Sequence, residues 1–320
     1  IKNENNFIDQ ELQAAIFPIN LFQNVFFQSK YTIKNNFIYP KGYIYIILSI
    51  IFTVLYLFSH YLQMQFDGLS SIAPLKTLYY SMLLNFHLYC FDGIILFINN
   101  VYNNKNTVQM IINLQKIMNV TRENTRSLRK CLKQWRKENW YYIICHCISY
   151  TIMSIINTKV FFKKWTSSNF FHELYLFLFI IYDINMLCAF RYMKLIGICL
   201  KIWIHNIQNF SKNRTHYFYT NKKEAKYYHF KKIFDHYITI LELFDLFKTI
   251  FQMPILLQIF YTFAHSLIYV QLFIEMGKLK VIVNTSVEIF VHFLKLTFQV
   301  YYNNNVIIFR VREYLSGYTS

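Results

Sequence analysis

The chain has 320 residues, of which 55% are hydrophobic, 20% aromatic and only 15% charged, and its formal net charge is +17. This composition excludes an intrinsically disordered chain and argues against a secreted or nucleic-acid-binding protein. The charges avoid several long stretches, a distribution typical of membrane proteins. The six cysteines show neither a CxxC pair nor the spacing of a zinc site, so we interpret them as reduced thiols that pack in the interior.

Six stretches of about 20 residues are poor enough in charge to be helices that cross a bilayer core of ~30 Å. In chain order they are 43–64, 77–99, 140–158, 173–200, 249–274 and 281–300. The first, third and fifth contain no Asp, Glu, Lys or Arg. Because strand-like alternation does not persist in any of them, we predict helices. The predicted fold is all-α, a polytopic transmembrane helical bundle in one domain (1–320). A water-soluble protein with large buried helices is the alternative.

Basic residues are distributed unevenly among the segments between these stretches. Nine lie in Lys105–Lys137 and eight in Lys201–Lys232, whereas 65–76, 159–172 and 275–280 hold one, three and two. Lys and Arg collect in the cytoplasmic segments of membrane proteins, so this distribution predicts a cytoplasmic N-terminus in a multi-pass protein of the plasma membrane. We interpret the basic segments as contacts with the lipid bilayer, in particular anionic inner-leaflet lipid, and not with nucleic acid.

Three charged residues lie deep within predicted membrane helices. Asp183 lies near the middle of 173–200, where a charge is costly unless it faces the interior of the bundle. It is either a polar contact between helices or part of a cavity for a ligand or an ion. Glu288 and Lys295 are seven residues apart in 281–300, too far for a direct ion pair along one helix, so each needs another partner.

Charged residues nearer the ends of predicted helices have a simpler interpretation. Asp92, in 77–99, is placed in the inner half of the bilayer, where its carboxylate reaches the interface. Arg191 and Lys194 lie where the helix 173–200 leaves the membrane. We interpret these two cations as extending to lipid headgroups without a functional role.

Aromatic residues in 77–99 contribute to a candidate binding site. Tyr80, Phe86 and Tyr89 are typical of an amphipathic ligand pocket, although packing between helices explains them as well. Together with the two intramembrane carboxylates they form a candidate ligand pocket, which consists of Tyr80, Phe86, Tyr89, Asp183 and Glu288.

Patterns of catalysis and metal binding are absent from the sequence. There is no P-loop, GxGxxG or GxSxG motif, and His229 and His236 lack an HExxH pattern. Cys145, His146 and Cys147 are consecutive, so on a helix their side chains diverge and do not close around one metal ion. We therefore expect no enzyme activity, no cofactor and no metal.

Three segments are similar to parts of a known receptor family. The first, 17–40 (FPINLFQNVFFQSKYTIKNNFIYP), looks like an amphipathic approach to a first membrane helix. The second, 101–119 (VYNNKNTVQMIINLQKIMN), looks like a helix entering a basic loop, and the third, 183–207 (DINMLCAFRYMKLIGICLKIWIHNI), like a fourth helix running into the cytoplasm. With the predicted topology, the chain resembles an insect gustatory receptor, especially moth and butterfly members grouped with bitter receptors. The similarity covers most of the chain.

The resemblance implies a taste chemoreceptor, a subunit of a ligand-gated, non-selective cation channel that detects small organic compounds, bitter plant compounds among them. It also implies a homo- or hetero-tetramer with other gustatory receptor subunits, a tastant pocket among the second to sixth helices, and a pore lined by seventh helices. The family motif TYhhhhhQF, in which h is apolar, is not present, and Thr297, Phe298 and Gln299 give only a short echo of it. We therefore expect the sequence to be incomplete at its C-terminal end, before the seventh helix.

Two questions stay open at the level of sequence. The helical spacing of apolar residues in 224–248 suits either assembly of subunits or packing within one subunit. A seven-span G-protein-coupled receptor and a membrane transporter are the alternative functions. The first needs an extracellular N-terminus, and the second uses Asp183 and Glu288 as substrate or proton sites.

Overall fold

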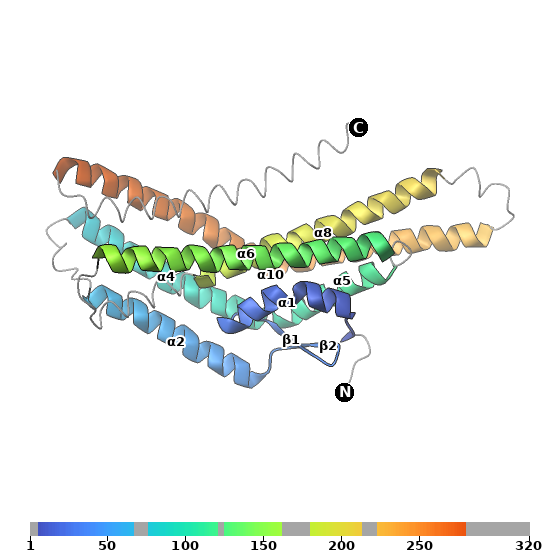
Figure 1. Cartoon of the computed structure of the whole chain (residues 1–320), viewed down its shortest axis with the longest axis horizontal. Helices are drawn as coiled ribbons and strands as arrows, with labels where there is room; N and C mark the ends of the chain where they lie inside the picture. The colour runs from blue at the N-terminus through green and yellow to red at the C-terminus, as the bar shows by residue number, and fades with distance from the viewer. Residues whose placement is uncertain (1–5, 67–75, 121–124, 162–179, 213–222, 280–320) are drawn as a thin grey trace. The chain divides into compact units, whose positions relative to one another are not determined.

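The computed structural model describes residues 6–66, 76–120, 125–161, 180–212 and 223–279 of the chain. In these ranges the fold consists of helices and one β-hairpin (Figure 1). The helices are α1 (Gln10–Val25), α2 (Tyr43–Phe66), α4 (Lys76–Tyr102), α5 (Asn104–Val120), α6 (Thr125–Phe161), α8 (Ile180–Lys212) and α10 (Lys223–Leu279). The strands are β1 (Tyr31–Lys34) and β2 (Phe37–Pro40), which pair antiparallel.

Among the helices of these ranges, none combines the length and the apolar character needed to cross a membrane. The prediction of an all-α polytopic transmembrane bundle is therefore wrong, and the β-hairpin is a second departure from it. The prediction counted only charges, whereas uncharged polar side chains also make a helix less apolar. Examples are His146 in α6 and Gln252, Gln258 and His265 in α10. The predicted helix 281–300 lies outside the described residues.

A two-residue turn closes the β-hairpin. Asn35 and Asn36 occupy the turn with φ of 54° and 66°, and the paired residues Lys34 and Phe37 flank them. Two successive residues with positive φ are typical of a type I′ turn, in which asparagine is favoured because its short polar side chain tolerates this conformation. The turn fixes the register of the two strands. The interpretation of 17–40 as one amphipathic approach missed this hairpin.

Hydrogen bonds fasten the hairpin to the start of α1. The backbone carbonyl of Asn36 accepts a hydrogen bond from the Ile8 amide at 2.9 Å, and its side-chain carbonyl accepts one from Gln13 Nε2 at 2.9 Å. Tyr31 and Ile38, one from each strand, are fully buried. The hairpin therefore contributes side chains to the core and is not a surface loop.

The chain divides into two compact units. Unit 1 comprises Ile1–Thr53, Ile95–His146 and Ile181–Ile255. Unit 2 comprises Val54–Ile94, Cys147–Ile180 and Leu256–Ser320. Arg191 of α8 and its partners on α6 lie in unit 1.

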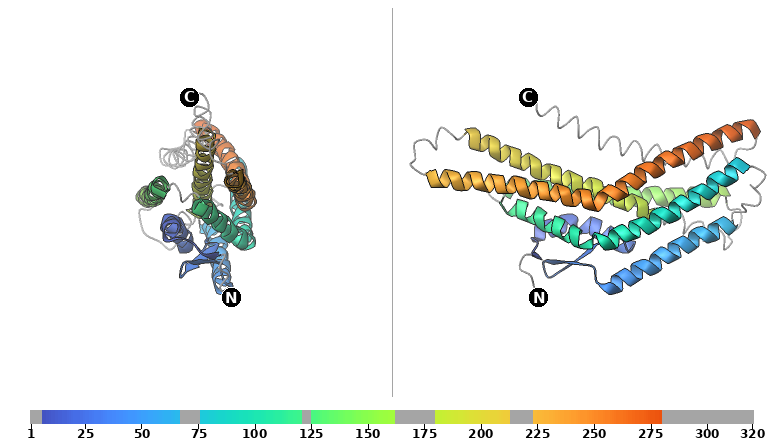
Figure 2. Two further views of the ribbon diagram at one scale, coloured as in Figure 1. Left: turned by 90° about the vertical axis from the view of Figure 1, so that its right-hand side faces the viewer. Right: turned by 180° about the vertical axis from the view of Figure 1, so that it is seen from behind.

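Helix α5 lies beside the hairpin and α1 within unit 1 (Figure 2). It is buried around most of its circumference, so it forms a large part of the core of this unit. Its buried apolar residues are Val108, Met110, Ile111, Ile112, Leu114, Ile117 and Met118. The amide group of Gln115 pairs with Asp9, the residue before α1: Oε1 accepts from the Asp9 amide at 2.9 Å, and Nε2 donates to Asp9 Oδ2 at 2.8 Å. Gln115 thereby fixes the point at which α1 begins.

Candidate functional site

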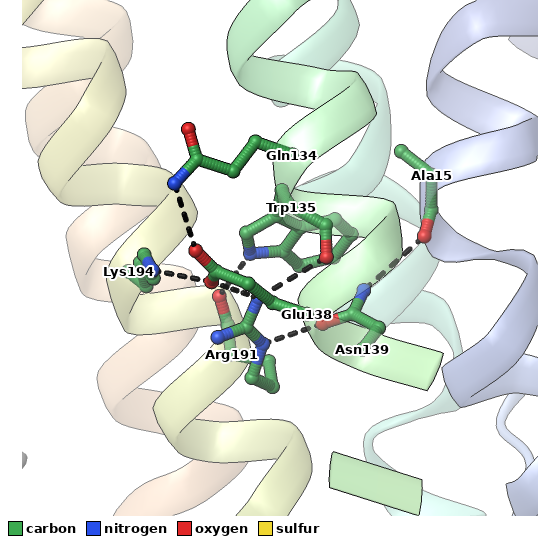
Figure 3. Close-up of polar contacts among 7 residues, drawn as sticks. All are labelled: Ala15, Gln134, Trp135, Glu138, Asn139, Arg191 and Lys194. Carbon is green, nitrogen blue, oxygen red and sulfur yellow. Dashed lines mark hydrogen bonds and ion pairs between the residues drawn. The ribbon is translucent and has the colours of Figure 1, made fainter. Parts of the chain in front are cut away.

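A buried arginine joins three helices of unit 1 (Figure 3). The side chain of Arg191, on α8, is only 4% exposed. Its Nη2 donates to Glu138 Oε2 at 2.9 Å and to the Trp135 carbonyl at 3.2 Å, and its Nε donates to Asn139 Oδ1. Asn139 Nδ2 in turn donates to the Ala15 carbonyl at 3.2 Å. One guanidinium group therefore links α1, α6 and α8.

Helical spacing explains how these groups meet. Trp135, Glu138 and Asn139 are three and four residues apart, so they share one side of α6. Arg191 and Lys194 are three residues apart on α8, and Lys194 Nζ forms a second ion pair with the Glu138 carboxylate. A buried guanidinium without partners is very costly, so the carboxylate and the amide are what permit an arginine in the interior.

The two cations determine the ionisation of Glu138. Partial burial by itself raises the pKa of this carboxyl group, but hydrogen bonds from Lys194 and Arg191, together with their positive charges, outweigh the burial. The pKa of Glu138 is therefore below its ordinary value, and the group is ionised at neutral pH. The interpretation of Arg191 and Lys194 as headgroup contacts is wrong, because both side chains bind Glu138.

Aromatic side chains extend this network to β1 and α10. Trp135 Nε1 donates to the Arg191 carbonyl at 3.2 Å, and the Trp135 ring lies 6.5 Å from the Tyr192 ring. The hydroxyl of Tyr192 is hydrogen-bonded to that of Tyr31 at 3.1 Å. The Tyr192 ring also lies 6.0 Å from the ring of Phe251 on α10. All four aromatic side chains are buried, so α6, α8, β1 and α10 share one interior.

Lys30 is a buried cation next to this aromatic cluster. It is 2% exposed, and among the described residues its Nζ has no hydrogen-bond partner. The Nζ atom lies 5.0 Å from the centre of the Phe251 ring, which is a cation–π contact. Burial lowers the pKa of Lys30 to about 8, although its interaction with Cys188 acts in the opposite direction. The cation–π contact compensates for only part of the lost hydration.

A proline interrupts the backbone hydrogen bonds of α10. Pro254 has no amide hydrogen, so the carbonyl of Ile250, four residues earlier, lacks its helical donor. Asn99 Nδ2, from α4, donates to this carbonyl at 3.1 Å. Asn103 Nδ2 lies 3.5 Å from the neighbouring Thr249 carbonyl and donates to Asn99 Oδ1 at 2.8 Å. Side-chain amides therefore satisfy the backbone where the helix is interrupted.

The candidate ligand pocket was predicted from five residues. Tyr80 lies on α4 and is 63% exposed. Phe86 and Tyr89 belong to the same helix and Asp183 to the first turn of α8, but their side chains lie outside the part that the structure describes, as does the whole of Glu288. The pocket therefore stays a prediction.

The residues that the sequence analysis missed are those of the polar network. Glu138 and Arg191 are 53 residues apart, and no local spacing pairs them. The contact between Asn99 and α10 was predictable in part from the sequence. Pro254 lies inside a predicted helix, and asparagines recur between Asn99 and Asn106. A proline inside a helix needs a substitute donor, and asparagine side chains supply one.

The ion pairs and hydrogen bonds of this network fix the positions of α1, α6 and α8 relative to one another. Its role is therefore structural. In the described ranges, no three or more His, Cys, Asp or Glu residues are grouped so that they are able to bind a metal ion. Comparison of the chain with models of protein families, with characterised proteins and with solved structures found no match.

Proposed function

We propose that the chain is a chemoreceptor subunit of the gustatory receptor type, part of a ligand-gated, non-selective cation channel. Its ligands are small organic compounds, bitter plant compounds among them, and its place is the plasma membrane with the N-terminus on the cytoplasmic side. The similarity of 17–40, 101–119 and 183–207 to this family supports the proposal.

The observation that carries the proposal is an inverted distribution of polar and apolar side chains. On α2, Ser49 and Ser59 are buried, whereas Ile47, Val54 and Phe58 are exposed. A surface helix in water has the opposite arrangement, with its apolar side turned to the core. Removing exposed apolar side chains from water lowers the free energy, so a helix with this arrangement is more stable where its exposed side contacts lipid.

Exposed apolar side chains next to buried polar ones also occur on α4 and in the part of α10 that follows Pro254. Asp92 is buried on α4, contrary to the interpretation that it reaches the interface, and the preceding Phe91 is 60% exposed. Gln258 is buried on α10, and the following Ile259 is exposed. Further exposed apolar residues of these helices are Ile94, Ile98, Leu256, Phe260, Phe263, Leu267 and Val270. We propose that these surfaces lie against lipid.

An apolar stripe on α10 supports assembly with other subunits. Phe230, Phe234, Leu241 and Phe244 are exposed and recur at helical spacing. Packing within the subunit therefore leaves part of the segment 224–248 open to a partner. We propose that this stripe contacts a second gustatory receptor subunit in a homo- or hetero-tetramer, since apolar aromatic residues are enriched at such interfaces.

The function is tested by recording currents from cells that express the chain while plant-derived organic compounds are applied and G-protein signalling is blocked. We expect a current that persists under the block. We also expect Asp183→Asn to alter the response and Lys163→Ala to leave it unchanged, because only the first removes a charge from the predicted pocket. Loss of the current under the block would favour a G-protein-coupled receptor. Saturable flux without conductance would favour a transporter.

A further inference from the structure

Helix α6 has an exposed side whose chemistry changes along its length. Lys130, Lys133 and Lys137 are exposed, and they are followed by Tyr141 and Ile144, which are 66% and 51% exposed. The successive spacings of three and four residues place all five on one side of an α-helix. This side is cationic over two turns and apolar over the next.

The opposite side of α6 is occupied by the core of unit 1. Leu132, Trp135, Asn139 and Ile143 are buried. Hydrogen bonds from Trp135 to α8 and from Asn139 to α1 fix the rotation of the helix about its axis. The network that buries the arginine of α8 therefore also holds the lysines and the tyrosine outward.

The three lysines are available to an external anion. In the described part of the chain they have no acidic partner, because the nearby carboxylate of Glu138 is engaged by Arg191 and Lys194. The apolar residues are available as well, and the same helical spacing continues along α6 through further exposed residues, Ile148, Ile152 and Ile155. A partner for this side must therefore combine a negative charge with a long apolar portion.

We infer that this side of α6 binds an anionic phospholipid, with the lysines at the phosphate headgroup and an acyl chain along the tyrosine and the isoleucines. The inference rests on the proposed function, because it takes the exposed apolar residues to face lipid. The step from Lys137 to Tyr141 is ~6 Å at the rise of an α-helix. That length is similar to the ~5–8 Å of headgroup region on each side of a bilayer core. Tyrosine is the residue type expected at this boundary.

The charge of the site selects the class of lipid. A zwitterionic headgroup carries no net charge, so it leaves the three lysines without net compensation. An anionic headgroup gains about fivefold in binding for each basic residue near the surface. An acidic peptide matches the lysines but is hydrated, and it leaves the apolar residues uncovered. An anionic phospholipid satisfies both parts.

The test uses the purified full chain and two kinds of vesicle. One kind contains phosphatidylcholine alone, and the other contains phosphatidylcholine mixed with phosphatidylserine. The chain is diluted from detergent onto the vesicles, and the bound fraction is measured by flotation. We expect the wild type to prefer vesicles with phosphatidylserine. The triple variant Lys130→Gln, Lys133→Gln, Lys137→Gln is expected to reduce this preference about a hundredfold.

The matched control removes the same charge elsewhere. In Lys105→Gln, Lys116→Gln, Lys231→Gln, three exposed lysines of the same basic segments are replaced that lie on α5 and α10, and the preference is expected to fall much less than in the α6 variant. Three results would overturn the inference and leave the proposed membrane location intact: equal losses in the two triple variants, equal binding of the wild type to both kinds of vesicle, or displacement of the serine-dependent binding by soluble polyglutamate. Failure of the wild type to bind either vesicle would contradict the proposed function itself.

Discussion

A hydrogen bond from Asn99 to Ile250 replaces the backbone hydrogen bond that Pro254 cannot form in α10. Asn99 Nδ2 lies 3.1 Å from the carbonyl oxygen of Ile250, which has no helical donor because residue 254 is proline. Both residues are buried, so without this amide the carbonyl would be unsatisfied in the interior. The side chain of one helix thus completes the backbone of another.

This relationship predicts a specific non-additivity between Asn99 and Pro254. Asn99→Ala should lower the free energy of unfolding by about 1–3 kcal/mol, the usual cost of an unsatisfied buried group. In a Pro254→Ala background the new backbone amide supplies the missing donor, so the same substitution should cost less, with a coupling of about 1 kcal/mol. Unfolding of the four proteins in detergent, followed by circular dichroism, measures the cycle.

Asn106→Ala is the control for this cycle. Asn106 donates to Asn103 at 2.8 Å and has no hydrogen bond to α10 among those described, so its effect should not depend on residue 254. Additive effects of Asn99→Ala and Pro254→Ala would show that Asn99 does not substitute for the missing donor.

How much of this fold the sequence predicts differs from feature to feature. The helical character of 43–64 follows from its apolar residues, and α2 (Tyr43–Phe66) begins at the first of them. Its behaviour toward a membrane does not follow from a count of charges, because uncharged polar residues contribute as well. The hairpin was predictable from the alternation around Asn35 and Asn36, a known turn signal. It was missed because the surrounding segment was interpreted as one amphipathic stretch.

The polar network was less accessible from sequence. Arg191 and Lys194 have the spacing of one helical side, but their partner Glu138 lies on another helix, and only the packing of α6 against α8 brings them together. An arginine near the end of an apolar stretch suits either an ion pair or a lipid headgroup, and local sequence does not distinguish the two. The predicted pocket stays a prediction for a different reason: four of its five side chains lie outside the described part of the chain.

Removing Arg191 should be far more harmful than removing Lys194. Arg191→Met leaves the buried Asn139 amide oxygen without its donor and Glu138 with one cation instead of two, so we expect a loss of about 3–5 kcal/mol. Lys194 is 24% exposed, and Lys194→Met should cost about 1 kcal/mol or less. Denaturant unfolding of the purified variants measures both. Equal losses would mean that the guanidinium is not the centre of the network.

Glu138 should make the protein sensitive to acid. Its pKa in the folded state is below the ordinary value of 4.5, so the folded state binds fewer protons than the unfolded state in this region. The stabilisation is then complete above about pH 4.5 and is lost as the pH falls through the folded-state pKa. Glu138→Gln should flatten the acid limb of the stability profile, whereas Asp245→Asn, at an exposed carboxylate, should leave it steep. Unchanged acid limbs in both variants would contradict the ion pairs.

Lys30 should have the opposite effect at alkaline pH. Its pKa is about 8 in the folded state against an ordinary value of 10.5, so above about pH 8 the unfolded state binds more protons and stability rises with pH. Lys30→Met should be more stable than the wild type at pH 7, by on the order of 1–3 kcal/mol, and the difference should shrink as the pH rises to about 10. Lys34→Met, at an exposed lysine of the same hairpin, should show no such trend. A constant difference between Lys30→Met and wild type would argue against a buried ammonium.

The aromatic stripe of α10 should determine oligomer size. We expect the double variant Phe230→Ser, Phe234→Ser to lower the mass of the detergent-solubilised complex, measured by light scattering, because apolar contact area is lost from the proposed subunit interface. Phe260→Ser with Phe263→Ser removes two exposed rings farther along α10 and should leave the mass unchanged. The same mass for all three proteins would place the interface elsewhere.

The most direct measurement maps which side chains touch lipid. The chain is expressed in cells, its membranes are loaded with a phospholipid whose acyl chain carries a photoreactive diazirine, and labelled residues are identified by mass spectrometry. We expect labels on exposed apolar residues such as Ile47, Val54 and Ile144, and none on the buried Met110 and Leu114 of α5. Two results would contradict the placement of these surfaces against lipid. In the first, the exposed residues are labelled by a water-soluble diazirine and not by the lipid reagent. In the second, the lipid reagent labels α5 as often as it labels the exposed residues.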